Sequence, residues 1–208
     1  MTRDNAHMNF LGHLWLADRT GTSLAGSILG DVVRGADLSA YPPPIALGIR
    51  LHRRVDAITD RHPAMRNAKG SFDKATRRYA GIVLDMAADH ALTQVWSQWH
   101  VESLEHFADR CGEAIEASGP WFEKGGGVRL RAAAFSALLQ SYAHDRGMER
   151  AYQRTSTRLR NPDQLIDASR DWLEHAKRLE PQLESLLSAQ LSAMQALMQS
   201  GSAVSTDG

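Results

Sequence analysis

The amino-acid sequence predicts an all-α protein, folded as a compact single domain of about seven helices. Apolar residues recur at helical spacing along most of the 208 residues. No segment alternates apolar and polar residues as a strand does, and no hairpin turn lies between β-branched runs. Because no internal repeat divides the chain, we expect one domain over residues 1–198 and a disordered tail over residues 199–208.

The elements of the N-terminal half follow from its apolar runs and from the residues that end them. The first apolar stretch, MNFLGHLWLA, covers residues 8–17. The segment SLAGSILGDVVRG then predicts a short helix that stops at Gly35, and the following YPPP run forces a turn. Two further helices are expected, over residues 45–60 and from Pro63 to about Tyr79. Residues 81–99 are apolar almost all round, which predicts a central helix.

The C-terminal half is expected to hold helices separated by glycine and proline. A helix over about residues 102–117 precedes a break at Gly119-Pro120 and at the triple glycine of residues 125–127. Helical patterns resume over about residues 128–158 and, after an Asn-Pro pair that suits a helix start, over residues 162–198.

Charge balance and cysteine content narrow the function classes. The 24 Lys and Arg residues equal the 24 Asp and Glu residues, so net charge gives no argument for a nucleic-acid partner. Cys111 is the one cysteine, which excludes an internal disulfide and a cysteine-based zinc site and favours a reducing, cytoplasmic location. No stretch approaches the roughly 18 uninterrupted apolar residues of a membrane-spanning helix, so no membrane association is expected.

Residues 48–63, GIRLHRRVDAITDRHP, carry the first candidate site. Helical spacing places His52 and Asp56 on one inward face, four residues apart, where both side chains can reach a single cation. An ion pair at the margin of the core would have the same spacing, so the pattern alone leaves both interpretations open. Arg53 and Arg54 project to the remaining side of the helix.

The apolar helix over residues 81–99 carries a second candidate site. Asp85 and Asp89 project to one side of it, where apolar residues are expected. Burying two adjacent carboxylates is costly unless a cation or a shared proton relieves their repulsion. A divalent metal explains the pair economically, with the neighbouring His90 as an imidazole ligand, and pairing of each aspartate with an arginine is the alternative.

Two other polar residues stand against their local preference. Asp31 lies in the last turn of the short helix before Gly35, where the helix dipole disfavours an anion by about 0.3–1 kcal/mol. His13 interrupts the first apolar stretch, where a satisfied core histidine is the simpler interpretation. Acids and imidazoles from several helices suit Mn²⁺, Fe²⁺ or Mg²⁺ better than a structural zinc ion.

Two basic clusters favour an acidic protein partner. Four arginines recur every fourth residue and would form one stripe on a continuous helix: Arg146, Arg150, Arg154 and Arg158. The second cluster consists of Lys74, Arg77 and Arg78. Such surfaces speed encounter with an acidic protein in a salt-dependent way, although an ordinary solvated helix face has the same pattern.

Four segments, in this order, resemble the acyl carrier protein phosphodiesterase family: MNFLGHLWLA, SILGDVVRG, GIRLHRRVDAITDRHP and LDMAADHALTQVW. The resemblance is strong over most of the first 100 residues and looser beyond them. That family is similar to the HD-domain phosphohydrolases, all-helical metalloenzymes with His and Asp ligands, which implies a divergent HD-like fold. The adjacent pair here runs Asp89-His90 rather than His-Asp, so the resemblance does not fix the ligand set.

The resemblance implies hydrolysis of the phosphodiester that joins 4'-phosphopantetheine to a serine of holo acyl carrier protein, with Mn²⁺ as the usual cofactor. The expected metal ligands are Asp31, His52, Asp56 and Asp89, completed by His90 or His13. Asp60 or His62 would protonate the leaving oxygen, and Arg53 and Arg54 would neutralise phosphate or contact the partner. Two alternatives stay open: a phosphohydrolase acting on nucleotides or other small phosphoesters, and a non-catalytic helical module that binds an acidic protein.

Overall fold

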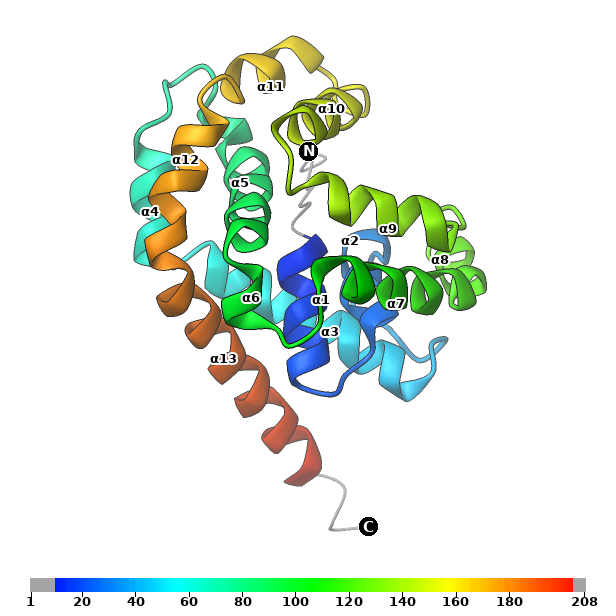
Figure 1. The fold of residues 1–208 in the computed structure, drawn as a ribbon. Helices are drawn as coiled ribbons and strands as arrows, with labels where there is room; N and C mark the ends of the chain where they lie inside the picture. Colours follow the sequence, from blue (N-terminus) through cyan, green and yellow to red (C-terminus); the bar gives the residue numbers. More distant parts are fainter. Residues whose placement is uncertain (1–9, 204–208) are drawn as a thin grey trace.

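The computed structural model describes residues 10–203 and, within that range, contains helices and no strand, which confirms the all-α class (Figure 1). The α-helices in chain order are α1 (Phe10–Arg19), α2 (Leu24–Val32), α3 (Pro43–Thr59), α4 (Pro63–Gly70), α5 (Ala80–Gln94), α6 (Trp96–Trp99), α7 (Leu104–Ala117), α8 (Gly119–Lys124), α9 (Ala132–Ser141), α10 (Asp145–Ser156), α11 (Pro162–Ala168), α12 (Trp172–Leu179) and α13 (Leu183–Ala203). Two short 3-10 helices are η1 (Arg77–Tyr79) and η2 (Glu180–Gln182). Across residues 10–203, no helix has both the length and the apolar character needed to cross a membrane.

The helices are more numerous than the seven or so expected, because several expected helices are interrupted. The helix that begins at Pro63 ends at Gly70, a poor helix former, instead of near Tyr79. Val95 leaves the helical region (φ −117°, ψ 19°), so the expected helix over residues 81–99 is divided into α5 and α6. Its central position is confirmed, since nearly every residue of α5 is buried.

The expected helix over residues 128–158 is likewise divided, into α9 and α10. The turn between them brings Gly147 so close to the Ser141 carbonyl that a Cβ would overlap it, and only glycine permits this approach. The helix expected over about residues 102–117 is α7, which ends at Ala117, and Gly119-Pro120 then starts a separate helix, α8, because proline fits the first turn of a helix. Helix α13 continues to Ala203, past the expected boundary at residue 198, and residues 204–208 of the expected tail lie outside the described part.

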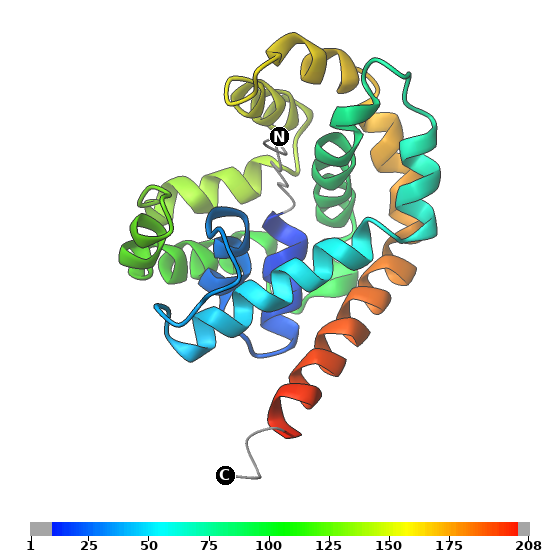
Figure 2. The same ribbon diagram turned by 180° about the vertical axis from the view of Figure 1, so that it is seen from behind.

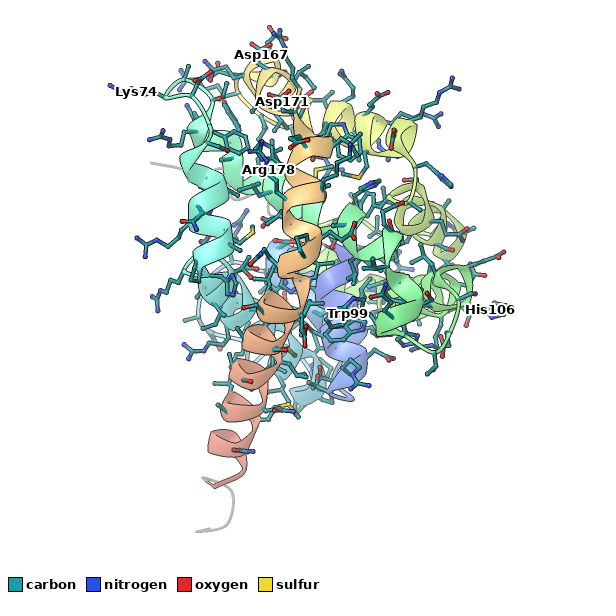
Figure 3. The ribbon with its side chains drawn as sticks, turned by 60° about the vertical axis from the view of Figure 1, so that its left-hand side comes forward. Lys74, Trp99, His106, Asp167, Asp171 and Arg178 are labelled. Carbon is teal, nitrogen blue, oxygen red and sulfur yellow. The ribbon has the colours of Figure 1, made fainter. Side chains whose placement is uncertain are left out.

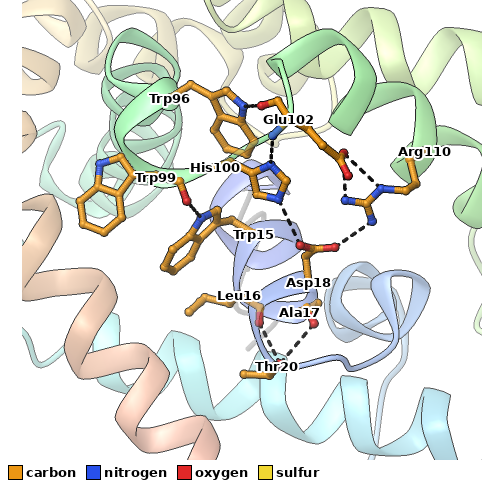
Figure 4. A network of polar contacts seen from close by, with 10 residues as sticks. All are labelled: Trp15, Leu16, Ala17, Asp18, Thr20, Trp96, Trp99, His100, Glu102 and Arg110. Carbon is orange, nitrogen blue, oxygen red and sulfur yellow. Dashed lines mark hydrogen bonds and ion pairs between the residues drawn. The ribbon is translucent and has the colours of Figure 1, made fainter.

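Helix α1 is fixed at its C-terminal end by a polar network with α6 and α7 (Figure 4). Its Asp18 carboxylate accepts hydrogen bonds from His100 Nε2 at 3.1 Å and from Arg110 Nη1 at 2.8 Å. The indole of Trp15 donates to the Trp99 carbonyl oxygen at 3.0 Å. These contacts hold a helix whose residues 11–17 are all buried, so α1 cannot shift without disrupting the core.

Helices α2 and α3 touch through two glycines, and α3 crosses the molecule next to α1 and α2 (Figure 2). A Cβ added to Gly26 would lie 2.9 Å from the Gly48 Cα atom, and a Cβ added to Gly48 would lie 2.8 Å from the Gly26 Cα atom. The two backbones therefore pack with no side chain between them. This close approach brings the inward face of α3 against the last turn of α2.

The glycine contact predicts a specific loss of stability. Gly48→Ala should lower the free energy of unfolding by about 1–3 kcal/mol, because the added methyl group overpacks a backbone contact. Gly70→Ala is the matched control: nothing lies within 4 Å of its added Cβ, so stability should be unchanged or slightly higher. Urea unfolding measures both, and equal stabilities for Gly48→Ala and the unsubstituted protein would contradict the packing account.

Candidate metal centre

Helices α1, α2 and α3 direct polar side chains into one cluster. His13 from α1 and His52 and Asp56 from α3 meet there: His13 Nε2 lies 3.1 Å from Asp56 Oδ1, and His52 Nε2 lies 3.2 Å from Asp56 Oδ2. Asp31, from the last turn of α2, places its Oδ1 3.4 Å from His52 Nε2. Both histidines are buried, whereas the two carboxylates are partly exposed. The structure therefore brings together four of the six residues expected to bind metal.

The spacing of these donor atoms suits a divalent cation. One donor atom each from His13, His52 and Asp56 lies within 4.8 Å of the others. Two donors bound to one ion at about 2.1 Å, at tetrahedral or octahedral angles, stand about 3.0–3.4 Å apart. The three His–Asp separations, at 3.1, 3.2 and 3.4 Å, fall at these values, and all three donors of the His13, His52 and Asp56 group lie within 4.8 Å of one another.

The backbone around His52 fixes which of its nitrogens faces the cluster. Nδ1 lies 2.6 Å from the Ser27 carbonyl oxygen, an acceptor, so Nδ1 carries a proton and donates it. Nε2 consequently points to the carboxylates, as in a metal-binding histidine. The ring has room because residue 30 is glycine, where a Cβ would overlap it. The His13 ring stacks on the His52 ring, with centroids 4.0 Å apart.

Charge in the cluster is coupled through short contacts. Burial lowers the pKa of His52, but the hydrogen bonds and charges of Asp31 and Asp56 outweigh it and raise that pKa to about 10. Burial raises the pKa of Asp56, but hydrogen bonds from His13 and His52 hold it well below its usual range. Burial and then the charge on His52 lower the pKa of His13. A positive charge beside the Asp56 carboxylate is therefore favourable, and a metal ion can supply it in place of a proton.

A polar pocket of about 230 Å³ opens beside the cluster and includes Asp31 and Asp56 in its wall. Arg53 also lines it and donates to the carbonyl oxygens of Val33 (2.9 Å) and Gly35 (2.8 Å). Its expected outward direction is therefore wrong, because these carbonyls, left free where α2 ends, draw the guanidinium back. Arg54 is exposed and does not line this pocket.

Arg34 is a pocket residue that the sequence reasoning missed. It is exposed, lines the polar pocket and forms no ion pair within residues 10–203. Its guanidinium is therefore available to an anion held next to Asp31. Its position in the sequence could have indicated this role. Arg34 follows Asp31 by three residues, just after a helix whose last turn carries that unfavourably placed carboxylate.

Among the described residues, Asp89 hydrogen-bonds to backbone amides and to none of the cluster residues. Its geometry therefore does not support the expected role of a metal ligand. Its two carboxylate oxygens accept hydrogen bonds from the backbone amides of Leu11 and Gly12, each at 2.9 Å. These amides are free because they belong to the first turn of α1. Burial and then the charge of Asp85 raise the pKa of Asp89 to about 8, against the lowering effect of the two amides. Asp89 thus positions α1, and with it His13.

His90, Asp60 and His62 also lie outside the cluster. His90 Nδ1 lies 2.8 Å from the Tyr142 carbonyl oxygen, and its ring packs edge-on against Trp172. Asp60, with 51% of its side chain exposed, pairs with Lys69 at 2.6 Å. His62 caps α4, and its Nε2 lies 3.2 Å from Ser185 Oγ. Because neither Asp60 nor His62 lines the polar pocket, the geometry does not support their expected role as proton donors.

The four arginines of the expected stripe are all exposed, but they do not share one helix. Helix α10 ends at Ser156, so Arg158 follows it. Arg154 and Arg158 line a second cavity that also includes Asp31.

The side chains of the second basic cluster, Lys74, Arg77 and Arg78, differ in their surroundings. Lys74 extends away from the body (Figure 3), whereas Arg77 donates to the Phe72 carbonyl oxygen and Arg78 packs over the Tyr79 ring. Only part of this cluster therefore presents its charge to solvent without a local contact.

Comparison with known proteins gives one family. The model of the family described as acyl carrier protein phosphodiesterase matches residues 8–189. Proteins named acyl carrier protein phosphodiesterase from Shigella boydii serotype 18 and Escherichia coli strain K12 are each 47% identical to this chain over 91 residues. The match covers 44% of this chain and 47% of each relative, so the chain spans about half the length of the curated relatives it matches. No solved structure matches the chain.

The metal centre predicts a contrast between two aspartates of one segment. Asp56→Asn should weaken Mn²⁺ binding at least about 100-fold, because it removes the carboxylate that contacts both histidines. Asp60→Asn, four residues later and paired with Lys69, should bind Mn²⁺ like the unsubstituted protein. Metal content after dialysis and the Mn²⁺-dependent rise in Tm report the difference, and undiminished binding by Asp56→Asn would contradict the site.

Proposed function

Because the chain belongs to the acyl carrier protein phosphodiesterase family, we propose that it is a metal-dependent phosphodiesterase that removes 4'-phosphopantetheine from holo acyl carrier protein. The products are apo carrier protein and 4'-phosphopantetheine. The observation that carries this proposal is the convergence of His13, His52 and Asp56 beside a polar pocket lined by two arginines. A structural ion pair would not need the adjacent pocket.

The proposed metal is Mn²⁺, with His13, His52 and Asp56 as ligands and Asp31 as the next donor. Imidazole nitrogens and carboxylate oxygens together suit Mn²⁺ or Fe²⁺, and Mg²⁺ would use the carboxylates. The sulfur ligands of a structural zinc site are absent from this cluster. When bound, such an ion lowers the pKa of water and polarises a phosphoryl oxygen.

The residues of the polar pocket define what the chain itself contributes to the reaction. Arg34 and Arg53 lie where their guanidinium groups can neutralise the phosphodiester, and Asp31 can orient the attacking water. Hydrolysis forms a bond between the water oxygen and phosphorus and breaks the bond to the carrier serine oxygen, which takes up a proton. The phosphate stays on pantetheine. An HD-like ancestry agrees with the all-helical fold and the His and Asp donors.

The proposed partner is the carrier protein itself, recognised as an acidic surface. Arg146 and Arg150 lie exposed on α10, and Arg154 and Arg158 continue from them to a cavity that includes Asp31. A docked acidic protein would therefore face both the arginines and the entrance to the site. The reaction would take place in the cytoplasm, which agrees with a chain whose single cysteine is buried.

The proposed reaction predicts a metal-dependent loss of mass from the carrier. Incubation of the purified protein with holo acyl carrier protein and Mn²⁺ should convert the carrier to its apo form, as measured by the intact mass of the carrier. The Asp56→Asn variant, or EDTA, should lower the rate at least about 100-fold, and Asp60→Asn should not. An unchanged carrier with Mn²⁺, Fe²⁺ and Mg²⁺ alike would refute the proposal.

The docking surface predicts a separate effect on KM. Arg146→Glu with Arg150→Glu should raise KM for holo carrier protein about tenfold at low salt with little change in kcat, because these arginines act before chemistry. Arg66→Glu, an exposed arginine on α4, is the matched control and should leave KM unchanged. Equal KM values for the double variant and the unsubstituted protein at low salt would refute the role of this surface.

A further inference from the structure

The cavity that Arg154 and Arg158 line has a volume of about 590 Å³ and lies between α1, α2, α8, α9 and α10. Its volume falls in the range of small-molecule sites, about 300–1,000 Å³. Its walls are mainly apolar, with aromatic side chains from three helices: Phe10, Phe122 and Phe135. The rings of Phe10 and Phe135 pack 5.7 Å apart, which joins the start of α1 to α9.

The cavity and the polar pocket beside the metal centre share one wall residue, Asp31. This residue lines both the apolar cavity and the polar pocket, and its Oδ1 lies 3.4 Å from His52 Nε2. Ile28 and Val32, from the same helix α2, continue the wall away from the centre. A ligand with its phosphate in the polar pocket would have to pass Asp31 for an attached arm to reach the cavity along α2.

The polar groups of the cavity restrict which kind of ligand arm can bind there. Besides Asp31, the charged residues in its wall are Arg154 and Arg158, and both are exposed, so they stand at the rim. A purely aliphatic chain would leave these guanidinium groups without an acceptor. An apolar chain that also carries amide carbonyl oxygens would satisfy both the walls and the rim.

We propose that this cavity binds the pantetheine arm of the substrate, with the phosphate at the polar pocket and the arm along α2, α8, α9 and α10. This inference rests on the proposed function and names the part of the substrate that the enzyme holds. The two methyl groups next to the phosphate meet the apolar wall beside Asp31, and the amides farther along reach Arg154 and Arg158. The enzyme thus recognises the prosthetic group by its arm as well as through the carrier surface.

Helix α9 offers a matched pair of substitutions to test the arm site. Ala134 is exposed and lines the cavity, so Ala134→Trp fills space where the arm would lie without entering the core. Ala137 is exposed on the same helix but is not among the cavity residues. Ala137→Trp therefore controls for the effect of a surface tryptophan on folding. Circular dichroism and Tm should match for the two variants.

The direct test measures binding of 4'-phosphopantetheine and of inorganic phosphate to the Mn²⁺-loaded protein by calorimetry. In the unsubstituted protein and in Ala137→Trp, 4'-phosphopantetheine should bind at least about tenfold more tightly than phosphate, because the arm buries apolar surface. In Ala134→Trp this advantage should disappear while phosphate affinity stays unchanged. Equal affinities for the two ligands in the unsubstituted protein, or a full advantage in a folded Ala134→Trp variant, would overturn the arm site.

Turnover of holo carrier protein separates this inference from the reaction on which it rests. If the unsubstituted protein leaves the carrier intact but 4'-phosphopantetheine still binds more tightly than phosphate, the reaction is refuted and the arm site is supported. If the carrier is hydrolysed at equal rates by Ala134→Trp and Ala137→Trp, with equal KM, the reaction is supported and the arm site is refuted.

Discussion

The close contact between α2 and α3 is the constraint on which the site depends. Gly26 and Gly48 let the two backbones meet, and Gly30 leaves room for the His52 ring. With any larger residue at these positions the helices would move apart, and Asp31 on α2 would lose its contact with His52 on α3. The glycines therefore do more than pack a core, because they place an acid and an imidazole from different helices within ligand distance of each other.

Helix α1 completes the centre, and its position depends on contacts at both ends. Asp89 binds the free amides at its N-terminal end, and Asp18 is held by His100 and Arg110 at the other. His13 lies between these two anchors, against Asp56 and the His52 ring. The polar pocket and the apolar cavity both include Asp31 in their walls, so in the proposed complex one acid would lie where the metal, the phosphodiester and the arm come together.

The sequence was sufficient for the parts of the site that depend on local spacing. Four-residue spacing placed His52 and Asp56 on one inward face, and the unfavourable position of Asp31 at a helix end singled out a residue that the structure places 3.4 Å from His52. The role of Asp89 could not be read in this way, because its partners are amides 77 and 78 residues away and a buried carboxylate looks the same whether it binds a metal or caps a helix. Arg53 was misplaced for a similar reason, since the carbonyls that draw it inward belong to α2. The all-α class followed from periodicity, whereas the helix ends at Gly70 and Val95 and the turn before Gly147 depend on local dihedral angles and close contacts.

In the proposed metal centre, His13, His52 and Asp56 bind one divalent ion while Asp89 binds backbone amides. Anomalous X-ray scattering from crystals of the Mn²⁺-loaded protein tests both halves of this claim at once. We expect a manganese peak about 2.0–2.3 Å from His13 Nε2, His52 Nε2 and an Asp56 oxygen, with the Asp89 carboxylate still on the amides of Leu11 and Gly12. A peak bound by Asp89 or His90, or no peak at the His13, His52 and Asp56 cluster, would contradict the proposed centre.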